Sequence, residues 1–376
     1  MANIPWIFRY GPVASSTVFT SDVMSWSLFL GRRNYLDNYA GGRWSIVIKN
    51  QTNLAAQFVR GTLVRIENPD HSFQGGVVNS VQFDDYPGNT GLSTATVLVD
   101  DPMAQAGRFF MDGFTLYATA LTTAQAVQTN TAYTGYNAPE ITTYGTGQST
   151  ASGTASYTGT ILNRLNLLQA TERGQMWPNF ANGINFISRN YADTPTVTFT
   201  RSTPGTNEIA YSDIRRVQAG DNFMNYVTIS PEIAAGATAT NSSSITSYGR
   251  TGYQVTTVDN TQTQASGLGS WLANMQSDPA SFRFEIDVTT AAQSVNTYIN
   301  DFLWNAQTGN GIANLVYRVP GASSDTTVVV VPEGIQVTGT PDQTRLTIYF
   351  SPATFYQYFT LNSSTLGILD TSRLGW

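Results

Sequence analysis

The amino-acid sequence predicts a mainly β protein with minor α content and more than one domain. At 376 residues the chain exceeds an ordinary single domain. Charged residues make up only 12% of it, about half the usual share. Thr, Tyr and Val suit pleated surfaces, and the abundant Gly and Asn suit turns. Short apolar runs with a two-residue period recur along the chain, and only two or three segments show helical spacing.

The first group of predicted strands lies within residues 1–119. In one run, Trp44, Ile46 and Ile48 alternate with more polar neighbours and share one face, which is typical of a half-buried strand. Short strands separated by Gly-, Pro- and Asn-rich turns are typical of a small sandwich or barrel. Further strands are predicted at residues 61–67, 75–83 and 94–99.

Residues 120–157 are predicted to be a linker or a long surface loop, because Thr, Ser, Gly, Ala and Tyr dominate them and no hydrophobic period is present. A helix is predicted over residues 158–173, where leucines form an apolar stripe and Gly174 stands at the expected stop. With a strand at residues 184–190, this helix defines a helix-plus-strands unit over residues 158–195.

The last predicted unit spans residues 196–376 and is again rich in strands. Asp259 is a suitable N-cap and Asp278 precedes a proline, so a helix is predicted near residues 259–277. The sequence pattern of residues 291–304 is compatible with a helix but does not by itself predict one. Strands are predicted at residues 196–200, 225–230 and 282–288 and in the runs TTVVVVP and RLTIYFS.

Composition limits the kinds of site that the chain can hold. The net charge of -6 speaks against a nucleic-acid-binding surface, which would be basic. The absence of cysteine excludes disulfides, zinc-thiolate clusters and thiol nucleophiles. No run approaches ~18 consecutive apolar residues, so membrane insertion is not expected. We expect no catalytic residue, no cofactor and no metal site.

The few titratable residues that could carry chemistry have simpler explanations. His71, the only histidine, lies in a polar turn without recognisable partners. Asp84-Asp85 and Asp100-Asp101 could be paired carboxylates, but adjacent strand residues point to opposite faces. We therefore interpret both pairs as strand-end or turn features.

Four stretches, taken in order, resemble the hub or minor tail proteins that long-tailed bacteriophages place at the tail tip. They are GRRNYLDNYAGGRWSIVIKN with the following GTLVRI and GGVV strands, LLQATERGQMWPNFANGINFISRN, NEIAYSDIRRVQAGDNFMNYVTIS with SSSITSYGRTGYQV, and the closing strands with FTLNSSTLGILDTSRLGW. None is a catalytic signature, so the resemblance rests on their order along almost the whole chain. The Thr/Ser/Gly-rich stretch after residue 121 and the Gly-rich second helix depart from the family pattern.

The resemblance implies two barrel-like tube domains with an inserted helix-containing α+β domain between them. The first would span residues 1–119, with strands near 196–230 as candidates to complete it. The insertion would span residues 158–195, and the second barrel-like domain would span residues 196–376. No enzymatic activity is implied.

In function, the resemblance implies a structural protein of the virion, made in the host cytoplasm and located at the tail tip. Three copies would form a ring-shaped hub that connects the tail tube to a central fibre or spike and frames the DNA exit channel. The implied partners are further copies of the chain, a distal tail protein, a tape measure protein and the fibre or spike. DNA would pass through without specific binding.

Six residues are candidates for a subunit interface: Arg32, Arg33, Tyr35, Tyr39, Glu172 and Arg173. The first four combine Arg with Tyr, which are frequent hot-spot residues of interfaces, although a solvated strand end fits them equally well. The last two close the first predicted helix. They could form an ion pair across a subunit contact, but solvation of the helix end is the favoured interpretation.

Three other functions remain as alternatives. The chain could be the distal tail ring protein above the hub, or a tip protein that binds host glycans through aromatic loops. A cell-wall hydrolase is the third, and the absence of a hydrolase motif disfavours it. The tail-tip hub is the interpretation that uses nearly all of the sequence.

Overall fold

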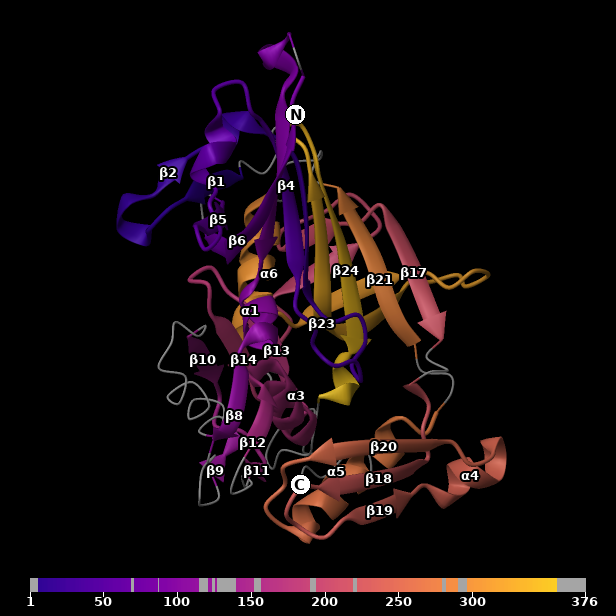
Figure 1. Cartoon of the computed structure of the whole chain (residues 1–376). Helices are drawn as coiled ribbons and strands as arrows, with labels where there is room; N and C mark the ends of the chain where they lie inside the picture. Colours follow the sequence, from indigo (N-terminus) through magenta and orange to yellow (C-terminus); the bar gives the residue numbers. More distant parts are fainter. Residues whose placement is uncertain are drawn as a thin grey trace.

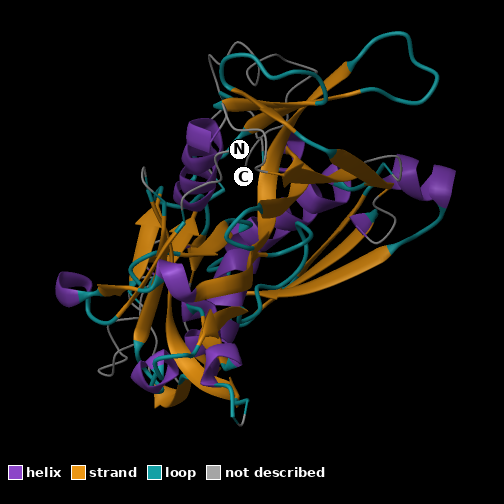
Figure 2. Cartoon of the chain, turned by 90° about the horizontal axis from the view of Figure 1, so that it is seen from above, coloured by secondary structure: helices purple, strands orange, loops and turns teal. Residues whose placement is uncertain are grey.

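A large twisted sheet forms the centre of the molecule in the computed structural model (Figure 1). The model describes residues 6–68, 71–86, 88–114, 121–123, 126, 140–151, 157–189, 194–218, 222–278, 282–289 and 296–356. Strands predominate over helices, as predicted, and the view from above shows the same (Figure 2). Within the described residues no helix is long and apolar enough to cross a membrane.

The central sheet contains 14 strands from both ends of the chain. Its hydrogen-bonded order is β16 (Glu208–Ala210), β15 (Val197–Thr200), β22 (Ala313–Tyr317), β23 (Thr326–Gly339), β3 (Val23–Gly31), β4 (Arg43–Lys49), β7 (Thr94–Asp100), β6 (Ser72–Asp84), β5 (Leu63–Glu67), β1 (Ile7–Tyr10) and β2 (Thr17–Val18). A branch continues from β23 through β24 (Thr344–Pro352) and β21 (Phe282–Thr289) to β17 (Asp213–Gln218).

The pairing of β3 with β23 joins the N-terminal and C-terminal parts of the chain into this one sheet. Leu28 lies opposite Val337 and Leu30 opposite Ile335 in the antiparallel register. At the end of β3 the backbone of Gly31 has a φ of +82°, and a Cβ there would lie 2.3 Å from the carbonyl oxygen of Glu333. Only glycine permits this close approach.

The described strands do not close into a barrel, because the sheet ends at β2, β16 and β17. The prediction of a mainly β fold is therefore confirmed, whereas the two barrel-like domains are not seen as closed barrels. Strands near residues 196–230 were candidates to complete the N-terminal unit. Among them, β15 and β17 pair with β22 and β21 in the same central sheet, and β18 (Tyr226–Pro231) belongs to a separate sheet.

The main apolar core lies against the central sheet and includes helix α6 (Asn296–Thr308). Phe302 of this helix packs edge-on against Phe199 at 5.0 Å between ring centroids, and Phe350 lies 5.4 Å from Phe199. Part of the segment that the sequence left open, residues 291–304, is therefore helical. Its residues 291–295 lie outside the described residues.

A second unit packs below the sheet around helix α3 (Ile161–Glu172), and its core residues include Leu165, Leu168 and Phe186. The helix ends at Glu172, close to the predicted stop at Gly174, and its C-cap Arg173 has a left-handed φ of 56°. The other elements of the second unit are α1 (Pro102–Arg108), β8 (Phe110–Phe114), β9 (Leu121–Thr122), β10 (Ile141–Tyr144), β11 (Thr150–Ala151), β12 (Tyr157–Thr160), β13 (Gln175–Pro178) and β14 (Ile184–Ile187).

The segment predicted as a linker, residues 120–157, thus contributes structure where it is described. Strand β10 pairs in parallel with β14, and β11 pairs with β9. Short polar strands of this kind lack the apolar alternation that identifies a strand in sequence.

A third unit lies inside the region predicted as the second barrel-like domain. A small sheet of β18, β19 (Ala237–Thr240) and β20 (Gly252–Thr257) packs against helix α5 (Gln262–Met275), with α4 (Ser242–Tyr248) at one end. Thr261, rather than Asp259, caps α5. Asp259 instead forms an isolated bridge with Ala151 of the second unit.

The described residues also form short 3-10 helices: η1 (Val13–Ser15), η2 (Thr20–Asp22), η3 (Leu54–Gln57), η4 (Thr90–Leu92) and η7 (Ala353–Phe355).

Candidate functional site

The six predicted interface residues occupy two different environments. Five of them are buried within this chain, with at most 2% of each residue exposed: Arg32, Tyr35, Tyr39, Glu172 and Arg173. Only Arg33 is exposed. The buried five contact other parts of the same chain, so we describe first the interior that they form and then the surface around Arg33.

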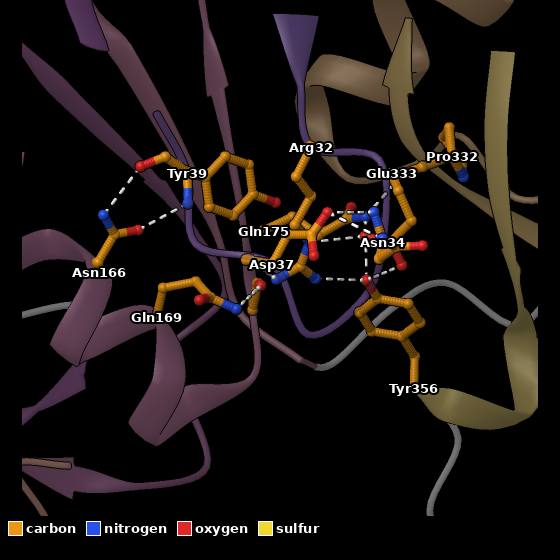
Figure 3. A network of polar contacts seen from close by, with 11 residues as sticks. Arg32, Asn34, Asp37, Tyr39, Asn166, Gln169, Gln175, Pro332, Glu333 and Tyr356 are labelled. Atoms are coloured by element: carbon orange, nitrogen blue, oxygen red, sulfur yellow. Dashed lines mark hydrogen bonds and ion pairs between the residues drawn. The ribbon is translucent and has the colours of Figure 1, made fainter. Parts of the chain in front are cut away.

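A polar network, here called the central junction, consists of Arg32, Gln175, Glu333 and Tyr356 (Figure 3). The Arg32 Nε donates to Glu333 Oε2 at 2.8 Å, and Arg32 Nη2 donates to the Tyr356 hydroxyl at 3.0 Å. That hydroxyl donates to Glu333 Oε1 at 2.6 Å and accepts from Gln175 Nε2 at 3.2 Å. Each of the four side chains therefore has a hydrogen-bond partner within the network, as buried polar groups generally do.

The central junction ties three regions of the chain together. Arg32 follows β3, Gln175 begins β13 of the second unit, and Glu333 lies in a register irregularity of β23 between Pro332 and Gly334. The Gln175 amide also donates to the Pro332 carbonyl at 2.7 Å. Because its partners come from segments more than a hundred residues apart, this network forms only when the units are docked.

Burial and charge set the ionisation of the central junction. Burial lowers the pKa of Arg32, but the charge and hydrogen bond of Glu333 together with the neighbouring Tyr39 and Tyr356 outweigh burial, so the pKa lies well above its ordinary value. Burial, followed by the charge of Glu333, raises the pKa of Tyr356 well above its ordinary value. The Tyr356 hydroxyl thus keeps the proton that it donates to Glu333.

Two tyrosines enclose the Arg32 guanidinium. Its carbon lies 5.3 Å from the ring centroid of Tyr35 and 5.0 Å from that of Tyr39, within cation–π range. Burial raises the pKa of Tyr39 to about 12. Asn166 of α3 holds the Tyr39 backbone through two hydrogen bonds of 2.9 Å (Figure 3). The turn after β3 is thereby attached to the second unit.

Glu172 occupies a second buried polar site at the end of α3. Its carboxylate accepts from the Thr123 hydroxyl at 2.8 Å and from the backbone N–H groups of Gln148 at 2.9 Å, Ser149 at 3.0 Å and Arg189 at 3.2 Å. Both earlier interpretations of Glu172, a solvated helix end and a pair across subunits, place it at the surface. The structure instead uses it to organise loops of its own chain.

Arg173 and Arg189 connect this region to the third unit. Arg173 lies 5.6 Å from the ring centroid of Tyr253 and donates to its hydroxyl at 3.3 Å. Arg189 lies 5.1 Å from the ring centroid of Trp271. Burial raises the pKa of the neighbouring Asp259 to about 6.

These interior groups are suited to holding the units of the chain together. The acceptors of Glu172 and Glu333 are occupied by donors of the chain, and no nucleophile paired with a base is among them. Among the described residues no three His, Cys, Asp or Glu side chains converge as metal ligands would. The sequence analysis did not predict roles for Gln175, Glu333 and Tyr356. The one sequence feature that indicates such a role is Glu333, a single carboxylate within an apolar run.

His71 and the Asp100-Asp101 pair also have structural partners. The His71 ring stacks on Trp304 at 5.4 Å and its Nε2 lies 2.7 Å from Asp301 Oδ1. Asp100 pairs with Arg43 and Arg108, and Asp101 caps α1 by accepting from Ala104 N at 2.6 Å. The interpretation of the Asp100-Asp101 pair as a strand-end feature is confirmed.

On the surface, Arg33 borders a groove of ≈ 370 Å³. This Arg33 groove is lined by Arg33, Asn34, Asp37, Arg215, Val217, Arg283, Phe284, Glu285 and Tyr349. Arg215 of β17 lies opposite Glu285 of β21, which lies opposite Tyr349 of β24. Three arginines, from the turn after β3 and from two strands, thus gather around one concave face.

Comparisons with solved structures show the same fold in phage tail proteins. A tail protein from Neisseria meningitidis is similar with a TM-score of 0.60 and 11% identity, over 92% of this chain and 96% of that one. A 43 kDa prophage tail protein from Shewanella oneidensis gives 0.56 and 11%, over 92% and 98%. A prophage tail protein from Listeria monocytogenes gives 0.55 and 9%, over 91% and 94%.

At these identities the similarity establishes the fold, and the predicted resemblance to tail proteins of long-tailed phages is confirmed at that level. No protein-family model and no curated protein matches the sequence.

Proposed function

We propose that this chain is a structural component of a phage tail tip, a ring-shaped hub that connects the tail tube to a central fibre or spike and frames the DNA exit channel. The observation that carries the proposal is that the fold of tail proteins extends over 92% of the chain.

The interior supports a structural role. Charged and polar side chains in the central junction and around Glu172 bind other groups of the same chain. Together with Arg173 and Arg189, they connect the central sheet to the second and third units. A rigid body of this kind suits a protein that transmits force between a tube and a fibre. We propose that it has no enzymatic activity.

The sheet edges support assembly with neighbours. Strand β17 pairs only with β21 among the described residues, and its other edge can accept a further strand. Low charge and exposed edges are expected of a subunit whose surfaces are covered in a larger particle. We propose a homotrimeric ring with a distal tail protein, a tape measure protein and the fibre or spike as partners.

The net charge of -6 fits a channel that DNA crosses without specific binding, because carboxylates facing the channel would repel phosphates. Location in the virion at the tail tip follows from the same proposal.

Electron microscopy of intact phage tails labelled with antibodies to this chain tests the proposal. We expect label at the tip, and averaged images with three copies around the channel. Label along the tube, or on a ring above the tip, would replace the hub with another tail role. Peptidoglycan release by the purified protein, lost when one carboxylate is removed, would replace the structural role with an enzymatic one.

A further inference from the structure

We propose that the Arg33 groove receives the tip of the β6–β7 hairpin of a second copy of this chain, so that copies join head to tail. This inference rests on the proposed ring and names the contact that would build it. The hairpin tip is defined by Phe83, Asp84, Asp85, Tyr86 and Leu92, which surround the turn beyond the last strand pair, Asp84 with Thr94.

The groove is an acceptor for carboxylates. Arg33 and Arg215 are exposed and Arg283 is half-buried, and no carboxylate of the described chain lies within ion-pair distance of any of the three. Two acidic residues share the groove. Asp37 already accepts from the backbone and side-chain nitrogens of Asn34, at 3.1 Å and 3.0 Å. With Glu285 included, the groove retains a positive excess.

The groove also has an aromatic floor. The Arg33 guanidinium lies 5.6 Å from the ring centroid of Tyr349 and 5.7 Å from that of Phe29. The two rings lie edge to face at 6.0 Å. Arg and Tyr over a concave, half-buried floor are the side chains that dominate binding energy in protein interfaces.

The hairpin tip has the complementary chemistry. Asp84 and Asp85 are exposed, and no described residue is within ion-pair distance of either. Beside them Phe83 is 49% exposed, Tyr86 52% and Leu92 57%. Large apolar side chains exposed together on a protruding turn are costly in water, and they suit a docking element. Two carboxylates flanked by these side chains match the three arginines and the aromatic floor.

The two surfaces cannot meet within one copy. The turn between β6 and β7 projects at the top of the molecule, whereas the ends of β17 and β21 that carry the groove lie lower on the sheet (Figure 1). A patch that fits a different patch on the next copy gives a heterologous contact, which closes into a ring when the rotation allows it.

Two charge-reversal variants test the contact. The first, Asp84→Arg/Asp85→Arg, disables the hairpin tip, and the second, Arg33→Glu/Arg215→Glu, disables the groove. All four residues are exposed, and exposed substitutions change folding stability by about 0.5 kcal/mol or less. We expect each variant to weaken self-association by about 30-fold or more, as loss of a close charge pair does in interfaces. Arg60→Glu, an exposed arginine away from the groove, is the matched control.

The decisive measurement is native mass spectrometry of the two variants mixed in equal amounts. Each alone should be monomeric. Together they should associate again, because the intact tip of one variant meets the intact groove of the other, and the reversed tip and the reversed groove also carry opposite charges. If both variants assemble as the wild type does, the proposed contact is wrong, and the ring proposal is unaffected. A wild-type chain that stays monomeric at every concentration would overturn both, whereas loss of assembly in Arg60→Glu would overturn the specific contact alone.

Discussion

Arg32 and Glu333, 301 positions apart in the sequence, form a buried ion pair of 2.8 Å whose side chains are 1% and 0% exposed. The Arg32 backbone N–H also donates to the Glu333 carbonyl oxygen at 2.8 Å. This double attachment holds the end of β3 against the irregular part of β23. It therefore sets the register between the N-terminal and C-terminal halves of the central sheet.

Removing the positive partner should destabilise the protein strongly. Arg32→Met leaves the Glu333 carboxylate buried without its counter-charge, and we expect the free energy of unfolding to fall by about 3–5 kcal/mol. Urea unfolding followed by tryptophan fluorescence measures the change. The control is Arg9→Met, which breaks the partly exposed pair with Glu67 and should cost about 1 kcal/mol or less.

A double-mutant cycle separates the pair from its surroundings. Arg32→Met with Glu333→Gln removes both charges, and the double variant should be more stable than the sum of the single losses predicts. Strictly additive losses would show that the two side chains do not act as a pair.

The contrast between strands and junction shows what the sequence can predict. The sequence predicts strands β4 and β24 because their apolar residues alternate, and this two-residue period is a local pattern. Arg32 was identified, but its role was not, because its partner is distant in the chain. Glu333 was informative in retrospect. It is the only acidic residue between Asp325 and Asp342, and a carboxylate inside a buried strand requires a partner.

The misplaced start of α5 has a related cause. Asp259 is a good N-cap by residue type, yet its carboxylate accepts from the Thr257 hydroxyl at 2.7 Å and its backbone bridges Ala151. Tertiary contacts with the second unit override the local preference, and Thr261 caps the helix instead. The order of units along a sheet is likewise set by pairings such as β3 with β23, which no local pattern reports.

The Tyr356 hydroxyl is predicted to be the weak point of the central junction. Tyr356→Phe removes the donor to Glu333 and the acceptor for Arg32 and Gln175 without changing the packed ring. We expect a loss of about 1–3 kcal/mol in the free energy of unfolding. Tyr349→Phe is the control, since its hydroxyl makes one contact of 3.5 Å with Gln336, and it should be nearly neutral. Equal effects at both positions would contradict a special role for Tyr356.

Asp101 should make stability depend on pH in one direction. Burial raises its pKa from 3.8 to about 7, so between those values the folded state holds a proton that the unfolded chain has released. Its contribution therefore falls as pH rises from about 4 to about 7. Asp101→Asn cannot ionise and still caps α1. We expect this variant to gain stability relative to wild type across that window and to stay level above it.

Urea midpoints measured at several pH values on both proteins check the Asp101 prediction. The exposed Asp342→Asn controls for loss of one carboxylate. If Asp101→Asn and wild type change in parallel with pH, then Asp101 is not the group responsible.

Glu172 distinguishes a role inside the chain from a role between subunits. In Glu172→Gln an amide N–H₂ replaces one acceptor oxygen and faces the backbone donors of Gln148, Ser149 and Arg189. Each donor left unpaired costs about 1–3 kcal/mol, so the melting temperature should fall. The exposed Glu140→Gln should leave it unchanged.

The oligomeric state of the same variant completes the argument. Because Glu172 is 0% exposed within the chain, the fraction that remains folded should associate as the wild type does in native mass spectrometry. If Glu172→Gln has the melting temperature of the wild type but no longer associates, Glu172 acts at the subunit interface. The loops around residues 148 and 189 are then held by groups other than its carboxylate.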